Sequence, residues 1–415
     1  MKIYDTTFKI LKSVLKDKNS FSSSLKQNSV GLKKEEAALS SNLAGLFLRN
    51  YYLITVIGDS IFGVKDEEPL IYIGSVYMNN SYKKALDEKE SIKYLTQKLA
   101  LYQVKFNDDA KLKRDLAVAD KREFLRQNVG GNRIRFLSAR NNLPVWVVKS
   151  LITQYDDEIA IKTINAMTKM PIQFGYLNKV LAPENYQEKL GDFEQLQGNL
   201  YLYKSNSSIR KNELVRNGTM VPIQKADYYF GLKLPEVQNG FVAMYSDGKN
   251  SLYPILFDKY LANNKVSVLS PNEKVNSDLF LRVKNKAGAN LSTYVGPRSE
   301  IISHISEKQN VFIYAPESSE LEQLRRAPEY GILFDTNRLD SIIQNQQKGL
   351  DEIAQFVAED GYLIYLVQTF NIKETYVRTR DFLQSNKNFT IAGEKLFFPF
   401  EQENSVYYYA ILKRK

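Results

Sequence analysis

Residues 263–415 alternate strand-like with helix-like segments, and this alternation limits the possible folds more than any other feature of the sequence. Five segments are short and rich in β-branched and aromatic residues, as buried strands are: 265–269, 291–295, 311–315, 362–367 and 405–412. Helical stretches separate them, and the clearest covers 339–357, where apolar residues recur every three or four positions. Because parallel strands need crossover helices between them, this part of the chain predicts a doubly wound, Rossmann-like α/β domain.

The first part of the chain has a helical pattern. Apolar residues recur at helical spacing within 8–15 and again within 43–47. Pro69 is the only proline in the sequence before Pro144, which suits uninterrupted helices. The pattern predicts an all-α bundle over residues 1–135, since packing several helices together buries their apolar stripes.

Residues 140–262 mix both kinds of element. Helical patterns are followed by strand patterns in this order: helices at 143–155 and 157–167, then strands at 172–178, 199–204 and 240–246. The sequence therefore predicts a multidomain protein. Its all-α bundle is followed by a small α+β middle domain over 140–262 and by the Rossmann-like domain over 263–415.

The chain is basic. It has 57 lysines and arginines against 47 aspartates and glutamates, a formal net charge of +10, so a polyanion such as RNA is the first partner to consider. Nine basic and three acidic residues lie between Lys111 and Arg140. This stretch is either a solvated helix face with a linker or a strip that contacts phosphates. The candidate contacts are Lys111, Lys113, Arg114, Lys121, Arg122, Arg126, Arg133 and Arg135.

The sequence has no cysteine and one histidine. Those counts exclude disulfides, thiolate zinc sites, cysteine nucleophiles and histidine clusters, so we expect no metal centre. The most apolar early stretch is interrupted by Arg49 and Asp59, and the first residues lack the apolar core of a signal peptide. We therefore expect a cytoplasmic protein without a membrane partner.

Short segments along nearly the whole chain carry a resemblance to a known family. They are, in order, 67–95, 143–149 (LPVWVVK), 175–178 (GYLN), 239–244 (NGFVAM), 311–318 (VFIYAPES), 325–329 (RRAPE), 363–369 (LIYLVQT) and 407–412 (YYYAIL). Together they resemble the RsmB/Sun group of ribosomal RNA cytosine-C5 methyltransferases, within the RsmB/NOP family. The resemblance implies a NusB-like RNA-binding domain over 1–135 and an RRM-like middle domain. It also implies S-adenosyl-L-methionine as cofactor, ribosomal RNA as partner, and ribosomal or transcription-factor proteins as further partners.

The chain departs from this family at the positions that carry its chemistry. The family adds a cysteine thiolate to C6 of cytosine so that C5 becomes nucleophilic. The resemblance places Gln368 and Glu317 at the two cysteine positions and Tyr314 at the position of a base-binding aspartate. The covalent mechanism therefore cannot run in this chain.

The cofactor-binding loop also departs from the pattern. A glycine-rich turn lets the backbone approach such a ligand, yet there is no glycine between Gly248 and Gly288. Strand 265–269 leads instead into Ser270-Pro271-Asn272-Glu273, and the segment 291–295 ends at Gly296-Pro297. The resemblance implies the cofactor, but the residues that would cradle it are missing from these positions.

Three hypotheses follow from these observations. The first is a diverged, non-catalytic family member that binds RNA, with Arg325 and Arg326 as further contacts because guanidinium groups match phosphates; the same pair could instead be a water-exposed helix end. The second is a methyltransferase that acts on nitrogen or oxygen without cysteine. The third is an assembly module that binds proteins. Whether the chain is an enzyme stays open from sequence alone.

Overall fold

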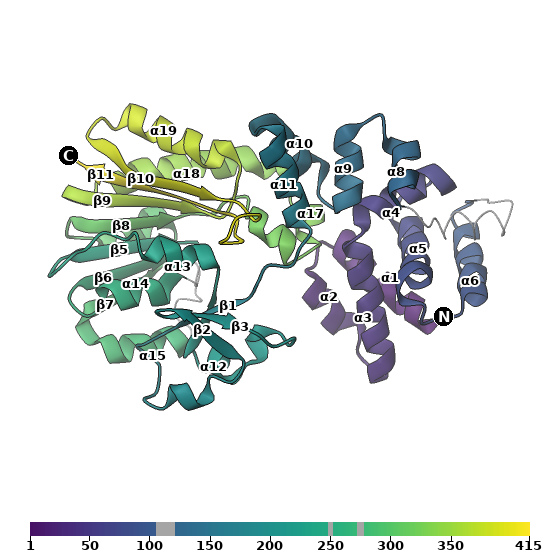
Figure 1. Ribbon diagram of the computed structural model, residues 1–415, viewed down its shortest axis with the longest axis horizontal. Helices are drawn as coiled ribbons and strands as arrows, with labels where there is room; N and C mark the ends of the chain where they lie inside the picture. Colours follow the sequence, from purple (N-terminus) through teal and green to yellow (C-terminus); the bar gives the residue numbers. More distant parts are fainter. Residues whose placement is uncertain (105–120, 248–251, 272–277) are drawn as a thin grey trace. The chain divides into compact units, whose positions relative to one another are not determined.

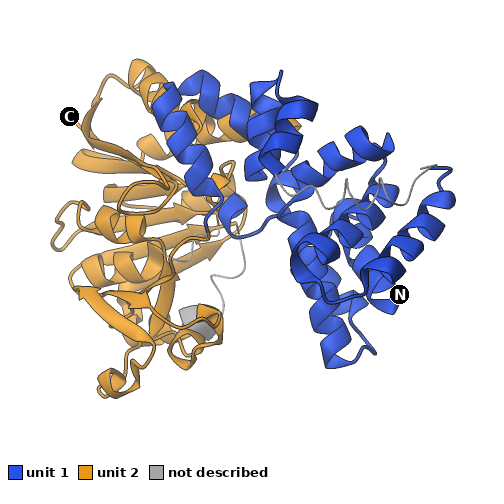
Figure 2. Cartoon of the chain, turned by 45° about the vertical axis from the view of Figure 1, so that its right-hand side comes forward, with its two compact units in different colours: residues 1–169, 323–335 blue, residues 170–322, 336–415 orange. Residues whose placement is uncertain are grey.

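The computed structural model describes residues 1–104, 121–247, 252–271 and 278–415. The chain divides into two compact units, each built from two separate stretches of sequence (Figure 2). Unit 1 comprises residues 1–169 and 323–335, and unit 2 comprises 170–322 and 336–415.

Unit 1 is helical, as the sequence predicts for its first part. Its helices are α1 (Lys2–Leu15), α2 (Phe21–Asn28), α3 (Lys34–Leu48), α4 (Tyr51–Ile57), α5 (Glu67–Met78), α6 (Glu88–Ala100), α8 (Lys121–Val129), α9 (Arg133–Asn141), α10 (Val145–Gln154), α11 (Asp157–Met167) and α17 (Tyr330–Leu333). Side-chain caps mark several helix starts: Asp87 accepts from the Glu90 N–H at 2.9 Å and Asp156 from the Ile159 N–H at 2.8 Å. The core contains Leu11, Phe47 and Ile73, all fully buried. None of the helices in the described ranges is both long and apolar enough to cross a membrane.

The segment 323–335 completes unit 1 although it lies far away in the sequence. The Tyr52 hydroxyl donates to the Gly331 carbonyl at 3.2 Å, and the Phe21 N–H donates to Glu329 at 3.2 Å. The Trp146 ring stacks on Phe334 with 5.1 Å between centroids. Unit 1 is therefore discontinuous in sequence. Its last piece, residues 323–335, lies along the chain between the two stretches of unit 2, and we call it the inserted segment.

Unit 2 contains a small antiparallel sheet with strand order β2-β3-β1-β4. Its strands are β1 (Phe174–Leu177), β2 (Phe193–Gln197), β3 (Leu200–Tyr203) and β4 (Met220–Ile223), joined by helix α12 (Glu213–Arg216) and followed by α13 (Lys225–Gly231). Phe174, Leu200 and Ile223 of this sheet are buried in one hydrophobic cluster with residues of the larger sheet. The two sheets therefore share a core.

The larger sheet has seven strands in the order β10-β11-β9-β8-β5-β6-β7 (Figure 1). Its strands are β5 (Phe241–Ser246), β6 (Lys265–Ser270), β7 (Leu291–Val295), β8 (Gln309–Ala315), β9 (Val357–Val367), β10 (Phe389–Phe397) and β11 (Tyr407–Arg414). The strands from β5 to β9 pair in parallel, whereas β11 is antiparallel to both of its neighbours. This is the doubly wound α/β fold that the sequence predicts.

Helices cover both faces of the larger sheet. Those between its strands are α14 (Tyr253–Tyr260), α15 (Asp278–Ala287), α16 (Arg298–Ile301), α18 (Leu339–Ala354) and α19 (Tyr376–Ser385). Val242 and Met244 of β5 belong to the cluster that also contains residues of α14. Successive strand residues point to opposite faces, so the intervening Ala243 and Tyr245 face the other side, where α18 packs on β8 and β9.

The three domains expected over 1–135, 140–262 and 263–415 stay a prediction, and the two compact units divide the chain at other residues. Helices α10 and α11 belong to unit 1, whereas the strands from β1 onward belong to unit 2. Strand β5, which local pattern places within 140–262, lies between β8 and β6 in the larger sheet. The reason is that its apolar pattern identifies a strand but does not identify the strands with which it pairs, and β8 is more than sixty residues away in sequence.

Candidate functional site

Unit 1 holds a pocket of about 510 Å³ with strongly basic walls. Five cationic side chains line it, and none of the described residues in its lining is acidic. We call this the cationic pocket; its cations are Arg49, Lys121, Arg122, Arg140 and Arg325. The lining therefore carries an excess of positive charge, and this excess favours an anionic ligand.

Four chain segments deliver these cations. Arg49 ends α3, Lys121 and Arg122 begin α8, Arg140 lies in the last turn of α9, and Arg325 comes from the inserted segment. The segments therefore converge only when unit 1 is complete.

Asn142 fixes the junction between α9 and α4. It ends α9 with a left-handed backbone at φ 49°, a conformation that asparagine tolerates better than most residues. Its side chain accepts a hydrogen bond from the Tyr52 N–H at 3.1 Å and donates to the Leu48 carbonyl at 3.0 Å. In the same wall, Asn50 donates to the Leu46 carbonyl at 2.8 Å. These amide groups are therefore engaged with the backbone.

Two of the cations are partly or fully withdrawn from water. Arg325 is only 3% exposed, and its Nε donates to the Lys169 carbonyl at 3.3 Å. Burial lowers the pKa of the Lys121 ammonium, which lies 4.0 Å from the centroid of the Tyr82 ring. Burial of a charged group costs free energy, and charged groups with shifted pKa values are common in binding sites.

The pocket unites only some of the candidate RNA contacts. Lys121, Arg122 and Arg325 line it. The other described candidates, Arg126, Arg133, Arg135 and Arg326, are exposed outside its lining; Arg133 pairs with Asp157, and Arg135 lies 3.9 Å from Asp59. Lys111, Lys113 and Arg114 lie outside the described residues.

Sequence reasoning missed two cations of the pocket, Arg140 and Arg49. Arg140 falls within the basic stretch that ends at that residue, so its signal was present. Arg49 stands alone in an apolar helix, and nothing in the sequence links it to residues more than seventy positions away.

A second candidate site is the carboxyl edge of the larger sheet. The strand order reverses between β5 and β8, and ligands of doubly wound folds bind in the crevice at such a point. The Asp247 N–H donates to the Ala315 carbonyl at 3.0 Å and holds the ends of the two strands together. Ser246 and Ser270, at the ends of β5 and β6, are fully buried.

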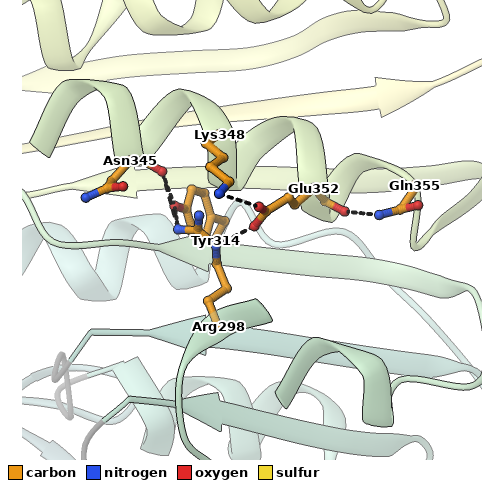
Figure 3. A network of polar contacts seen from close by, with 6 residues as sticks. All are labelled: Arg298, Tyr314, Asn345, Lys348, Glu352 and Gln355. Atoms are coloured by element: carbon orange, nitrogen blue, oxygen red, sulfur yellow. Dashed lines mark hydrogen bonds and ion pairs between the residues drawn. The ribbon is translucent and has the colours of Figure 1, made fainter. Parts of the chain in front are cut away.

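Tyr314 points away from this edge and packs beneath α18 (Figure 3). Its hydroxyl accepts a hydrogen bond from Arg298 Nη1 at 3.0 Å and donates to the Asn345 carbonyl at 3.2 Å. Arg298 Nε in turn donates to Glu352 at 2.8 Å, and Lys348 lies 3.7 Å from the same carboxylate. Burial raises the pKa of Tyr314 well above its ordinary value. Tyr314 is thus a buried packing residue whose hydroxyl is bonded to Arg298 and to the Asn345 carbonyl.

Glu317 and Gln368, at the two positions that the resemblance assigns to cysteines, differ in their exposure to solvent. Glu317 is about half-exposed and pairs with Arg338 at 2.7 Å. Gln368 is 7% exposed, at the end of β9. An amide is not a nucleophile, and a carboxylate does not add to C6 and leave as a thiolate does.

Glu374 ties the loops after β8 and β9 together. Its fully buried carboxylate accepts hydrogen bonds from the Ser319 N–H at 2.8 Å, the Ser319 hydroxyl at 2.5 Å, Gln346 of α18 at 3.1 Å and Asn371 at 3.1 Å. Burial raises its pKa even though these hydrogen bonds act in the opposite direction. The loops that carry Glu317 and Gln368 are therefore anchored to one buried side chain.

Comparisons with known proteins locate the fold. No protein-family model matches the chain, and no curated protein matches its sequence. Among solved structures, PH0851 superposes with a TM-score of 0.72 at 13% identity, covering 100% of this chain and 98% of the other. A methyltransferase homolog from Pyrococcus horikoshii gives 0.53 at 13% identity, covering 68% and 99%. The fold is that of a methyltransferase.

A further structure with this fold is NSun6 from Pyrococcus horikoshii with SFG, at a TM-score of 0.52 and 8% identity, covering 65% of this chain and 97% of that one. The larger sheet of unit 2, with its reversal of strand order between β5 and β8, is the doubly wound sheet of this fold.

The described residues at this edge do not fit S-adenosylmethionine. In dinucleotide-binding folds an acidic residue beyond the first strand–helix unit holds the ribose hydroxyls, but β6 ends at Ser270 and Pro271. The Tyr253 phenol interacts with the side chains of Ser246 and Ser270, and burial raises the pKa of Tyr253 to about 12. Asn272 and Glu273 lie outside the described residues. We therefore derive no chemical step through this cofactor. Within the described ranges, no three or more histidine, aspartate or glutamate side chains are arranged to hold a metal.

Proposed function

We propose that this chain is an RNA-binding protein built on a methyltransferase fold and that it works without cysteine-dependent catalysis. The cationic pocket carries the proposal, because five basic side chains without an acidic neighbour in the lining form an anion site in a chain of net charge +10. Phosphate contacts supply most of the non-specific affinity of proteins for nucleic acids.

The finer assignments rest on the sequence resemblance. It supports membership of the RsmB/Sun group, a NusB-like role for residues 1–135 and ribosomal RNA as the target, with ribosomal or transcription-factor proteins as further partners. We propose the cytoplasm as its location, in keeping with the expectation from sequence. The residues at Tyr314, Glu317 and Gln368 support the non-catalytic part of the proposal, since none of them can replace a thiolate.

We expect the full-length chain to bind single-stranded RNA with an affinity that falls steeply as salt rises. For about five phosphate contacts, raising the salt from 50 to 200 mM should weaken binding about 100-fold, because each contact releases counterions. Fluorescence anisotropy of a labelled 12-nucleotide RNA measures this, with a ribosomal RNA fragment as the second probe. Absence of binding at 50 mM salt, or binding that does not respond to salt, would refute the proposal.

A cysteine-free methyltransferase is the second candidate, and one observation favours it. Strand β5 is central in the larger sheet and is followed directly by Asp247 and Gly248, so an acid–glycine pair follows the strand at the position where glycine-rich turns begin in such folds.

Calorimetric titration with S-adenosylmethionine separates the two candidates. The non-catalytic proposal predicts no binding heat at any of several temperatures, since the described edge lacks the residues that cradle this ligand. A one-site isotherm would instead put the cysteine-free transferase first, and transfer of a labelled methyl group to RNA would then identify its product.

A further inference from the structure

The size of the cationic pocket restricts what it can hold. Its volume of about 510 Å³ lies within the range of about 300–1,000 Å³ that is usual for small-molecule sites. A nucleic acid duplex is far wider than such a cavity. A single nucleotide extruded from a strand is of the right scale, as in proteins that bind unstacked bases.

The walls of the pocket have two chemical characters. One part is the set of cations already described. The other part is apolar and includes Leu53, Leu125, Leu143, Pro144 and Met167. Inorganic phosphate would use only the cations, and an apolar ligand would use only the second part. A nucleotide uses both, because its phosphate pairs with guanidinium groups and its base covers apolar surface.

Apart from the cations, several polar side chains of the lining make hydrogen bonds to the backbone. The amide groups of Asn50 and Asn142 donate to backbone carbonyls of α3, and the side chain of Asn141 donates to the Leu137 carbonyl at 2.9 Å. The Tyr52 hydroxyl donates to Gly331. Base identity is read by hydrogen bonds to base edges, so these walls recognise the phosphate and the apolar base surface rather than the sequence.

We infer that the cationic pocket takes one unstacked nucleotide of a single-stranded RNA, with its phosphate on the arginines and its base against the apolar wall, and with little discrimination among bases. This inference rests on the proposed function and adds to it the form of RNA that is bound and the part of the chain that binds it.

Charge reversal at Arg140, with a matched control in helix α10, tests the inference. Arg140 and Lys149 are both exposed cations of unit 1, but only Arg140 lines the pocket, and Lys149 is not among the candidate RNA contacts. Arg140→Glu should weaken binding of the 12-nucleotide single-stranded RNA at least tenfold, whereas Lys149→Glu should change it by about twofold or less. Far-UV circular dichroism and thermal melting of both variants show whether each is folded. Charge reversal of the buried Arg325 is avoided because it would disturb folding.

The ligand series gives an independent readout on the wild-type chain. Uridine monophosphate and adenosine monophosphate should bind with affinities within about threefold of each other, and both more tightly than inorganic phosphate or uridine. A duplex RNA of the same length should compete at least tenfold less well than the single strand. Arg140→Glu should remove the binding of both mononucleotides.

The outcomes separate this inference from the function on which it rests. Salt-sensitive RNA binding that Arg140→Glu and Lys149→Glu weaken equally would overturn the pocket as its site and leave RNA binding standing. Equal competition by duplex and single strand would likewise overturn the unstacked nucleotide. Failure of the wild-type chain to bind RNA would reject the proposed function and the inference together.

Discussion

Gly349→Ala should destabilise unit 2 by about 3 kcal/mol, in the upper part of the range for overpacked cores. A Cβ atom at Gly349 would lie 1.8 Å from the hydroxyl oxygen of Tyr314 and 2.3 Å from its Cζ. Alanine raises helix propensity by about 1 kcal/mol, but the buried Tyr314 ring has nowhere to move because α18 and the sheet enclose it. Urea unfolding followed by far-UV circular dichroism measures the change.

Gly393→Ala is the matched control for this experiment. Gly393 lies in β10, and the nearest atom to its added Cβ would be Ile411 Cδ1 at 3.8 Å, an ordinary van der Waals distance. Its effect should stay within about 0.5 kcal/mol. Equal unfolding midpoints for the two variants would show that Tyr314 does not pack against α18 as described.

Glu374→Ala should cost about 3–5 kcal/mol, the range for removing one member of a buried charged network. The substitution leaves donors of Ser319, Gln346 and Asn371 without their acceptor in the interior. Glu374→Gln keeps the shape but turns an amide NH₂ toward some of these donors, so it should also be destabilising. Glu359→Ala, at an exposed position of β9, is the control and should change the free energy of unfolding by less than about 0.5 kcal/mol.

The pH dependence of these variants tests the same group. Burial raises the pKa of Glu374 in the folded state above 4.5, the pKa of a glutamate in the unfolded chain. Between the unfolded-state pKa and the folded-state pKa, the folded chain therefore binds more protons than the unfolded one. Its contribution to stability is therefore complete below pH 4.5 and is lost as the pH rises through the folded-state pKa. The stability difference between wild type and Glu374→Gln should shrink as the pH increases from 4.5, and a difference that grows with pH would contradict the assignment.

Local pattern predicted the helices in the first part of unit 1 and six strands of the larger sheet, because each has a periodicity that its own residues carry. It did not predict β10. That strand is at the sheet edge, its middle residues are exposed, and it contains Gly393 and Glu394. An edge strand does not need the apolar alternation that identifies a half-buried one. Local pattern did not show which strands β5 pairs with, since pairing depends on residues far away in sequence, whereas the resemblance compared residues 239–244 with the strand that opens a catalytic domain.

The residues of the candidate sites divide in the same way, into those that their neighbours in sequence identify and those that only the fold brings together. Lys121 and Arg122 were identified by their neighbours in a basic stretch, and Arg325 by its guanidinium pair with Arg326. Arg49 could not be identified, because its role depends on a helix end that meets α8 and α9 only after folding. The resemblance gave Tyr314 a position in the chain but could not show that its side chain turns toward α18.

The insertion of residues 323–335 into unit 1 has a consequence for synthesis on the ribosome. A nascent chain that has just released residue 169 still lacks Leu324, Arg325, Pro328 and Gly331, which belong to the wall of the cationic pocket. The 166 residues from 170 to 335 must emerge first, which takes about 10–30 s at ordinary translation rates. During that interval the N-terminal helices have neither their closing segment nor a finished binding site, so an early ribosomal product cannot capture RNA there. A fragment that stops at residue 169 would preserve that unfinished state permanently.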